Sequence, residues 1–299
     1  MAHIPVLLKE IIKYSDPRPG ENFIDGTCGG GGHTVEILPR IGKEGKILCL
    51  DLDEDALVRA SQNIAAQNKD LSERVFFAND NFANLEAVVS KNNFSPVNVI
   101  LVDLGMSSDQ LEESSRGFSF LKDEPLDMRF SIKQELTAGE IVNQWPQDEL
   151  EKIFREYGEE KFARRISQQI VSARKLKPIL TTGRLVLEIV QAVPKRFQYG
   201  RIHFATRSFQ ALRIAVNDEL GNLEKFLPQA INILADGGRL VLISFHSLED
   251  RIVKNFFRTQ AKEGKLRILT KKPITPSTEE IQTNPRSRSA KLRAALKLS

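Results

Sequence analysis

The sequence has few cysteines and no long apolar run. Only Cys28 and Cys49 occur among its 299 residues, too few for a disulfide framework or a four-cysteine zinc site, so we expect no bound metal. No apolar run approaches the ~20 residues that a membrane span needs. The first ten residues also lack the basic start and long apolar core of a secretion signal. We therefore expect a protein of the reducing cytoplasm without a membrane partner.

The composition is otherwise that of an ordinary globular chain, but the charge is unevenly distributed. Apolar residues make up 41% and charged residues 27%, which excludes collagen-like and wholly disordered classes. Residues 1–149 hold 14 basic and 25 acidic side chains, whereas residues 150–215 hold 14 and 5, and residues 216–299 hold 15 and 9. A basic second half favours a polyanionic partner, although solvated helical faces would also explain it.

Short apolar runs alternate with helical patterns in both outer parts of the chain. Strands are expected at residues 22–25, 46–51, 75–78, 97–103, 239–245, 266–269 and 292–297. Helices are expected at residues 4–14, 33–39, 54–67, 83–91, 206–234 and 249–260. A tight turn at residues 236–238 precedes the fifth strand, and a loop at residues 273–289 separates the last two. This alternation predicts an α/β fold with a mostly parallel sheet covered by helices on both faces.

An insertion interrupts this alternation. Residues 111–135 are irregular, and residues 137–195 show helical periodicity throughout, with Thr137 and Glu140 spaced as a helix capping box. We therefore expect one domain from residues 1–110 and 206–299, and an inserted helical, basic domain from residues 111–205.

The strongest local signal is a glycine-rich loop, Asp25-Gly-Thr-Cys-Gly-Gly-Gly-Gly-His33, directly after the first expected strand. Glycines let the backbone approach a ligand closely. Asp51 follows Gly32 by 19 residues, at the end of the second strand, where nucleotide-binding sheets place a carboxylate for the ribose hydroxyls. A glycine run alone could be a flexible turn, but the two features together predict a ligand that contains adenosine.

The spacing of the glycines narrows the choice of ligand. It matches neither the Gly-x-Gly-x-x-Gly pattern of dinucleotide sites nor a P-loop. Asp25 and Asp103, at the ends of the first and fourth strands, suit a cationic ligand such as S-adenosylmethionine better than a pyrophosphate. Either acid alone could instead cap a turn. A nicotinamide-dependent oxidoreductase and a non-catalytic RNA-binding protein remain the alternatives.

Several blocks of the sequence resemble the RsmH (MraW) family. The blocks lie in the family's order at residues 25–33, 103–111, 116–120, 125–129, 205–207, 209–213, 243–251 and 284–286, and the match runs from residue 3 to near residue 293. His203-Phe204 departs from the family's usual His-Pro, and the stretch between Phe257 and Asn284 is shorter than in relatives.

The resemblance implies a fold, a reaction and a set of contacts. The fold is a class I methyltransferase, Rossmann-like, with a mostly parallel seven-stranded sheet and an inserted helical domain. The reaction transfers a methyl group from S-adenosylmethionine to the exocyclic N4 of a cytidine in 16S ribosomal RNA. The implied donor-binding residues are Gly31, Gly32, His33, Asp51, Phe82, Asp103 and Gln110. By residue type alone, Phe82 would more often be a core aromatic.

The cytosine amino group is a weak nucleophile, because its lone pair is delocalised into the ring. We expect direct in-line transfer across about 3–3.5 Å, without a covalent enzyme intermediate. The motif Asp/Asn-Pro-Pro-Tyr/Phe of many amino-methyltransferases is replaced here by Asp103-Leu-Gly-Met106. Catalytic candidates are therefore Asp103, Ser244 and His246, with His246 equally suited to a structural hydrogen bond.

The basic insertion is the expected RNA-binding surface. Its candidate residues are Arg164, Arg165, Lys195, Arg196 and Arg207, with Phe197 and Tyr199 placed to stack on bases. The expected partner is 16S ribosomal RNA or the small ribosomal subunit, and not DNA. A homodimer remains an open alternative.

Overall fold

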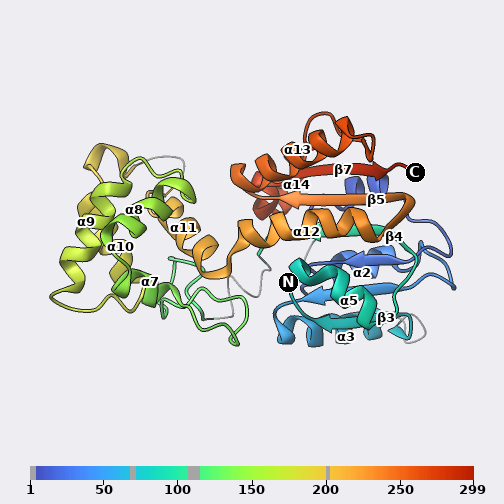
Figure 1. Cartoon of the computed structure of the whole chain (residues 1–299). Helices are drawn as coiled ribbons and strands as arrows, with labels where there is room; N and C mark the ends of the chain where they lie inside the picture. The colour runs from blue at the N-terminus through green and yellow to red at the C-terminus, as the bar shows by residue number, and fades with distance from the viewer. Residues whose placement is uncertain (1–4, 68–71, 107–114, 200–202) are drawn as a thin grey trace. The chain divides into compact units, whose positions relative to one another are not determined.

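A computed structural model describes residues 5–67, 72–106, 115–199 and 203–299 (Figure 1). The chain divides into two compact units: unit 1 is Met1–Gly105 with Leu220–Ser299, and unit 2 is Met106–Glu219. The helical insertion expected at residues 111–205 falls within unit 2, which extends to Glu219. No helix in the described ranges combines the length and the apolar character needed to cross a membrane.

Unit 1 is built on one seven-stranded sheet of order β3-β2-β1-β4-β5-β7-β6. Its strands are β1 (Phe23–Asp25), β2 (Ile47–Asp51), β3 (Val75–Asn79), β4 (Val97–Asp103), β5 (Leu234–Ser244), β6 (Leu266–Ile268) and β7 (Lys291–Lys297). Only β7 runs antiparallel to its neighbours, β5 and β6. The expected mostly parallel seven-stranded sheet is thus confirmed.

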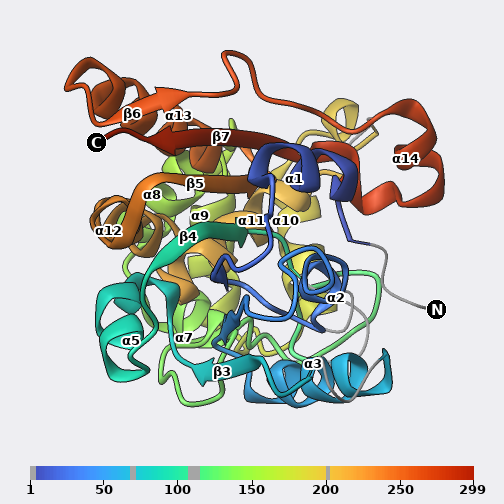
Figure 2. The same ribbon diagram turned by 90° about the vertical axis from the view of Figure 1, so that its right-hand side faces the viewer.

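Helices cover both faces of this sheet. On one face lie α1 (Leu8–Ser15), α2 (Gly32–Ile37) and α3 (Glu54–Gln67), and on the other α5 (Leu85–Lys91), α12 (Glu219–Ile233) and α13 (Ser247–Lys262). Figure 2 shows α5 and α12 on one side of the strands and α2 and α3 on the other.

Alternate residues of the central strands enter two different cores. In β4, Val99 and Leu101 pack with α1–α3, whereas Ile100 and Val102 pack with α5, α12 and α13. All four side chains are fully buried. A strand covered on both faces needs an uninterrupted apolar sequence, which explains the run that predicted β4.

The structure corrects two local predictions. The turn expected at residues 236–238 is instead part of β5, where the pairing with β4 shifts from Val97↔Leu234 to Val99↔Arg239. Gly237 takes a φ of +75° in this irregularity, a conformation that favours glycine. The loop expected at residues 273–289 contains α14 (Thr278–Thr283) and a 3₁₀ turn, η3 (Pro285–Ser289).

Unit 2 is helical, with its own apolar core. Its helices are α7 (Ala138–Gln144), α8 (Gln147–Glu156), α9 (Ala163–Arg174), α10 (Thr182–Ala192) and α11 (Thr206–Asn217), with a 3₁₀ turn, η2 (Lys195–Phe197). Phe154 lies fully buried in this core. Thr137 and Glu140 form the predicted capping box at the start of α7.

Candidate active site at the carboxyl ends of the strands

The strand order places a topological switch point between β1 and β4. The chain leaves β1 for β2 and β3 on one side and returns to β4 on the other. In open α/β sheets the crevice at such a point holds the ligand. The glycine loop follows β1 and Asp103 ends β4, so both lie at this crevice. Gly26 N–H donates to Leu101 O (2.8 Å), and Asp103 N–H donates to Thr27 Oγ1 (2.7 Å).

Gly31 shows why the loop must be glycine-rich. Its φ is +79°, in the left-handed region that strains other residues. A Cβ at this position would lie only 3.2 Å from Ala60 Cβ and 3.3 Å from Ala60 Cα. The loop thus packs against α3 at a position where a side chain does not fit.

Asp51 ties the end of β2 to the glycine loop. Its Oδ2 accepts the Gly29 N–H (2.8 Å), and its Oδ1 accepts the Asp53 N–H (2.9 Å). A carboxylate oxygen has two lone pairs, so each can accept one more hydrogen bond. Burial, only partly offset by these two backbone bonds, raises the pKa of Asp51 to about 6. The carboxylate therefore has its orientation fixed and retains capacity for two hydroxyl donors.

His33 and Asp103 meet across the crevice. His33 Nε2 lies 3.3 Å from Asp103 Oδ2, and the imidazole is buried. Asp103 Oδ1 accepts the Gly105 N–H (3.1 Å). His33 Nδ1 is buried and has no hydrogen-bond partner among the described residues. A buried polar atom of this kind normally has a partner, which a ligand could supply.

Asp25 lies behind the loop and is almost wholly buried. Its Oδ2 accepts the Thr34 hydroxyl (2.8 Å), whereas its Oδ1 has no partner in the part of the chain that the structure describes. Burial raises the pKa of this carboxyl. A second polar atom near the loop thus awaits a hydrogen-bond donor.

Phe82 is both a core residue and a neighbour of the loop. It begins the 3₁₀ turn η1 (Phe82–Asn84) after β3 and packs edge-to-face on Phe226, with ring centroids 5.4 Å apart. Its side chain is only partly buried, and a Cβ on Gly26 would lie 3.8 Å from Phe82 Cβ. The expected donor-binding residue Gln110 lies outside the described residues.

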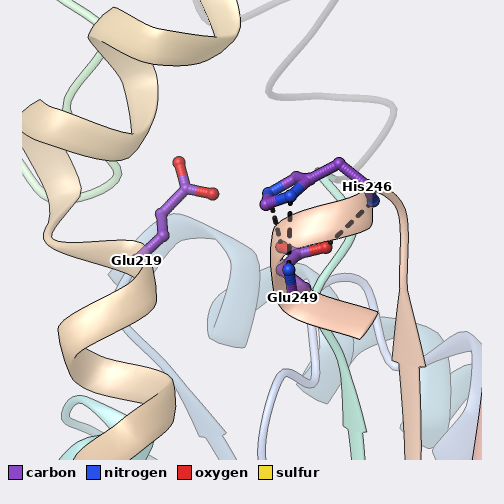
Figure 3. Close-up of side chains that lie close together, drawn as sticks. All are labelled: Glu219, His246 and Glu249. Atoms are coloured by element: carbon purple, nitrogen blue, oxygen red, sulfur yellow. Dashed lines mark hydrogen bonds and ion pairs between the residues drawn. The ribbon is translucent and has the colours of Figure 1, made fainter. Parts of the chain in front are cut away.

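At the start of α13, His246 and Glu249 form a capping box (Figure 3). Glu249 N–H donates to His246 Nδ1 (3.4 Å), while Phe245 N–H and His246 N–H donate to Glu249 Oε2 (2.8 and 3.2 Å). Because Nδ1 accepts, the ring proton belongs on Nε2, which lies 3.2 Å from Glu249 Oε1 without hydrogen-bond geometry. Glu219, labelled in the same view, forms a bidentate ion pair with Arg213 (2.8 and 2.9 Å).

Ser244 ends β5 and is buried. Its Oγ donates a long hydrogen bond to Lys291 O (3.4 Å). The ring of the next residue, Phe245, packs so closely on Gly105 that a Cβ there would lie 2.6 Å from Phe245 Cε2. The same Cβ would lie 3.1 Å from Asp103 Oδ1, so the end of β5 adjoins the end of β4. Only the glycine two residues after a strand-end acid could have signalled this contact in the sequence.

In unit 2, the structure brings the expected RNA-binding residues to one segment. Arg164 and Arg165 are exposed in the first turn of α9, and Phe162 just before them contacts Phe197 of η2 (centroids 5.1 Å apart). Lys195 and Arg196 precede Phe197 in η2 and are exposed, and the Arg196 guanidinium lies 4.9 Å from the Phe197 ring.

Arg207 joins the same region from α11. Its Nη1 donates to Glu159 O (3.0 Å), three residues before Phe162. Phe197 and Tyr199 remain 48% and 86% exposed, so both rings are available for stacking. The contact with Phe162, which links the two basic pairs, was not predicted from the sequence.

Comparisons with known proteins agree with these features. A sequence model of the MraW methylase family matches residues 1–298. A protein of Heliobacterium modesticaldum named Ribosomal RNA small subunit methyltransferase H is 46% identical over 99% of this chain and 98% of its own length. Its namesake in Clostridioides difficile is 43% identical over 99% of both chains. Among solved structures, an rRNA methylase from Streptococcus thermophilus covers 100% of both chains at 12% identity, with a TM-score of 0.45. The chain therefore belongs to the MraW methylase family.

Proposed function

We propose that this protein transfers a methyl group from S-adenosylmethionine to the exocyclic N4 of a cytidine in 16S ribosomal RNA. The observation that carries the proposal is Asp51, whose carboxylate is fixed by two backbone N–H groups beside the glycine loop and keeps acceptor capacity on both oxygens. The relatives' shared name supports small-subunit ribosomal RNA as the substrate.

The residues at the switch point fit this donor. Asp51 would hold the two ribose hydroxyls, and Gly31 and Gly32 would let the backbone approach the donor. Phe82 would lie beside the adenine. Asp103 and the unpartnered Oδ1 of Asp25 offer acceptors and negative charge for a cationic ligand with an amino group. An acidic crevice of this kind favours S-adenosylmethionine over a nicotinamide dinucleotide, whose pyrophosphate it would repel.

The donor supplies an electrophilic methyl group, and the chain would position the acceptor nitrogen. Asp103 would accept a hydrogen bond from the cytosine amino group, which favours the pyramidal, more nucleophilic nitrogen. The Gly105 N–H and His33 would hold the Asp103 carboxylate in place. The target cytidine must be unpaired or flipped out for its amino group to be reached.

The other two catalytic candidates would act from the end of β5. In the observed tautomer His246 would donate from Nε2 to the base, while its Nδ1 caps α13. Ser244 would position the same strand end through its bond to Lys291 O. A covalent cysteine mechanism is disfavoured, because a hydrogen bond to Cys49 and burial raise the pKa of the Cys28 thiol well above its usual value.

We assign donor binding to unit 1 and RNA recognition to unit 2. Arg164, Arg165, Lys195, Arg196 and Arg207 would contact phosphates, which gives affinity without sequence discrimination. The partner would be the 16S RNA or the assembled small subunit, in the cytoplasm. A homodimer stays a prediction that a measured mass in solution would decide.

The test is transfer of labelled methyl groups from S-adenosylmethionine to small ribosomal subunits from cells that lack this protein. Nucleoside mass spectrometry should then detect N4-methylated cytidine. Asp103→Asn should lose transfer by at least ~100-fold, as expected when a group that acts in the transition state is removed, and should still bind the donor in calorimetry. Methylation of a different base, or of no base, would refute the assignment.

A further inference from the structure

The segment between β6 and β7 returns to the edge of the sheet where the active site lies. β6 pairs with the last residues of β7, from Leu266↔Lys297 to Ile268↔Ala295. The chain then follows β7 backwards, with Leu269 N–H donating to Ala294 O (2.9 Å) and Ile274 pairing with Leu292.

This direction brings the segment to the carboxyl end of β5. Because β7 is antiparallel to β5, its first residue, Lys291, lies opposite Ser244. In Figure 1, α14 lies at the arrowhead end of β5. Lys271 and Lys272 lie between the two β7 contacts, at Thr270 and Ile274, and Arg288 lies in η3 just before Lys291. All these contacts are within unit 1.

Lys271, Lys272 and Arg288, which we call the β6–β7 strip, are exposed. None of the three has an ion pair or hydrogen bond from its side chain within the part of the chain that the structure describes. Other basic residues of unit 1 have structural roles: Arg239 binds Glu21, and Arg293 binds Asp250. The strip therefore has no comparable internal role.

The surrounding charge is strongly positive. Residues 262–299 hold 11 basic and 3 acidic side chains. Of the acids, Glu263 is paired with Lys265 (2.9 Å), and Glu280 accepts the Leu7 N–H (2.7 Å). This contrasts with the acidic crevice, whose carboxylates would repel a polyanion.

We propose that the β6–β7 strip binds phosphates of the RNA substrate that flank the target nucleotide, as a second contact surface separate from unit 2. The proposal rests on the proposed function, because it takes RNA as the substrate. Three unpaired cations beside the reacting edge would attract the backbone of a strand whose base enters an acidic crevice. Such contacts would fix the position of the strand without discriminating its sequence.

The test measures how binding depends on salt. The strip variant is Lys271→Gln, Lys272→Gln and Arg288→Gln. The matched control is Lys262→Gln, Lys265→Gln and Arg267→Gln, which removes three exposed cations at the opposite end of β7, where Arg267 pairs with Leu296. Both are compared with the wild type by filter binding to unmethylated small subunits between 50 and 200 mM salt.

Each lost phosphate contact should reduce the slope of log K against log salt by about 0.7 to 0.9. Three lost contacts would make the strip variant about 20- to 40-fold less sensitive to this salt change than the wild type. Its KM for subunits should rise while kcat and donor affinity stay unchanged. The control should keep the wild-type slope.

Equal slopes for the strip variant and the control would overturn the inference, even if the wild type methylates RNA normally. Loss of binding to phosphatidylserine vesicles with an unchanged RNA slope would also overturn it, in favour of a lipid surface. If the wild type transfers no methyl group to any RNA, the proposed function fails instead, and the RNA-binding slopes still decide the role of the strip.

Discussion

Substitution of Asp51 by asparagine tests the donor site most directly. The carboxylate now accepts hydrogen bonds from the Gly29 and Asp53 N–H groups, and in the proposed complex it would accept two more from ribose hydroxyls. Asparagine replaces one oxygen with an NH₂ group, which cannot accept from either a backbone N–H or a hydroxyl. It also removes the charge that strengthens the remaining bonds.

The magnitude follows from these lost bonds. A hydrogen bond to a charged group contributes about 1.5–3 kcal/mol, so losing one and weakening another should cost about 2–4 kcal/mol of binding. Donor affinity in calorimetry should therefore fall by about 30- to 700-fold. Asp55→Asn is the matched control, because Asp55 is exposed in the first turn of α3, and it should bind the donor like the wild type.

The pH dependence gives a second readout of the same residue. Burial raises the pKa of Asp51 to about 6, and hydroxyl donors favour the ionised form. Donor affinity should hence fall as pH decreases from 7 to 5, by at most about tenfold per pH unit below 6. Asp51→Asn should show no such dependence.

Folding should respond in the opposite sense. A carboxyl whose pKa is raised in the folded state is destabilising when ionised, so this cost is present above pH 6 and disappears toward pH 4. Asp51→Asn should accordingly retain the wild-type unfolding free energy at pH 7 or exceed it. An Asp51→Asn protein that binds the donor as tightly as the wild type, with the same pH profile, would refute the reasoning.

Three further predictions concern the loop, the helical unit and its basic surface. Gly31→Ala should lower the unfolding free energy by about 1–2 kcal/mol and weaken donor binding in calorimetry, because its φ is positive and its Cβ would press on α3; unchanged stability and binding would contradict this. Phe154→Ala should lower the stability of unit 2 by about 3–5 kcal/mol, as hydrogen exchange would show, since the ring is fully buried; protection like that of the wild type would contradict it. Arg164→Gln with Arg165→Gln should reduce the salt slope of RNA binding by about 1.4–1.8 without changing donor affinity; an unchanged slope would remove both residues from the RNA surface.

Elements with strong periodicity were predictable from the sequence. The predicted strand at residues 97–103 and helix at residues 54–67 coincide with β4 and α3. The β5 error has a physical cause: Asp236-Gly237-Gly238 favours a turn locally, but pairing of Leu234 with Val97 extends the strand across it. Local turn signals lose to long-range pairing of this kind.

The same distinction applies to the site. The glycine loop, Asp51 and Asp103 were predictable, because each directly follows a strand and parallel strands bring their carboxyl ends to one edge. The double role of Phe82 depends on Phe226 from α12, and the Phe245–Gly105 contact joins two distant segments. Contacts between distant segments leave no spacing pattern in a single sequence.

His246 is the residue whose role its type could not decide, and His246→Asn separates the two possibilities. Asparagine is a good N-cap, so the start of α13 should keep its first-turn hydrogen bond and the unfolding free energy should change by less than about 0.5 kcal/mol. Asparagine cannot reproduce the Nε2–H donor of the ring, so kcat should fall by about 100-fold if that group acts on the base. A stable His246→Asn protein with the wild-type kcat would show that His246 only caps α13, and the acceptor role proposed for Asp103 would then have to account for the chemistry without it.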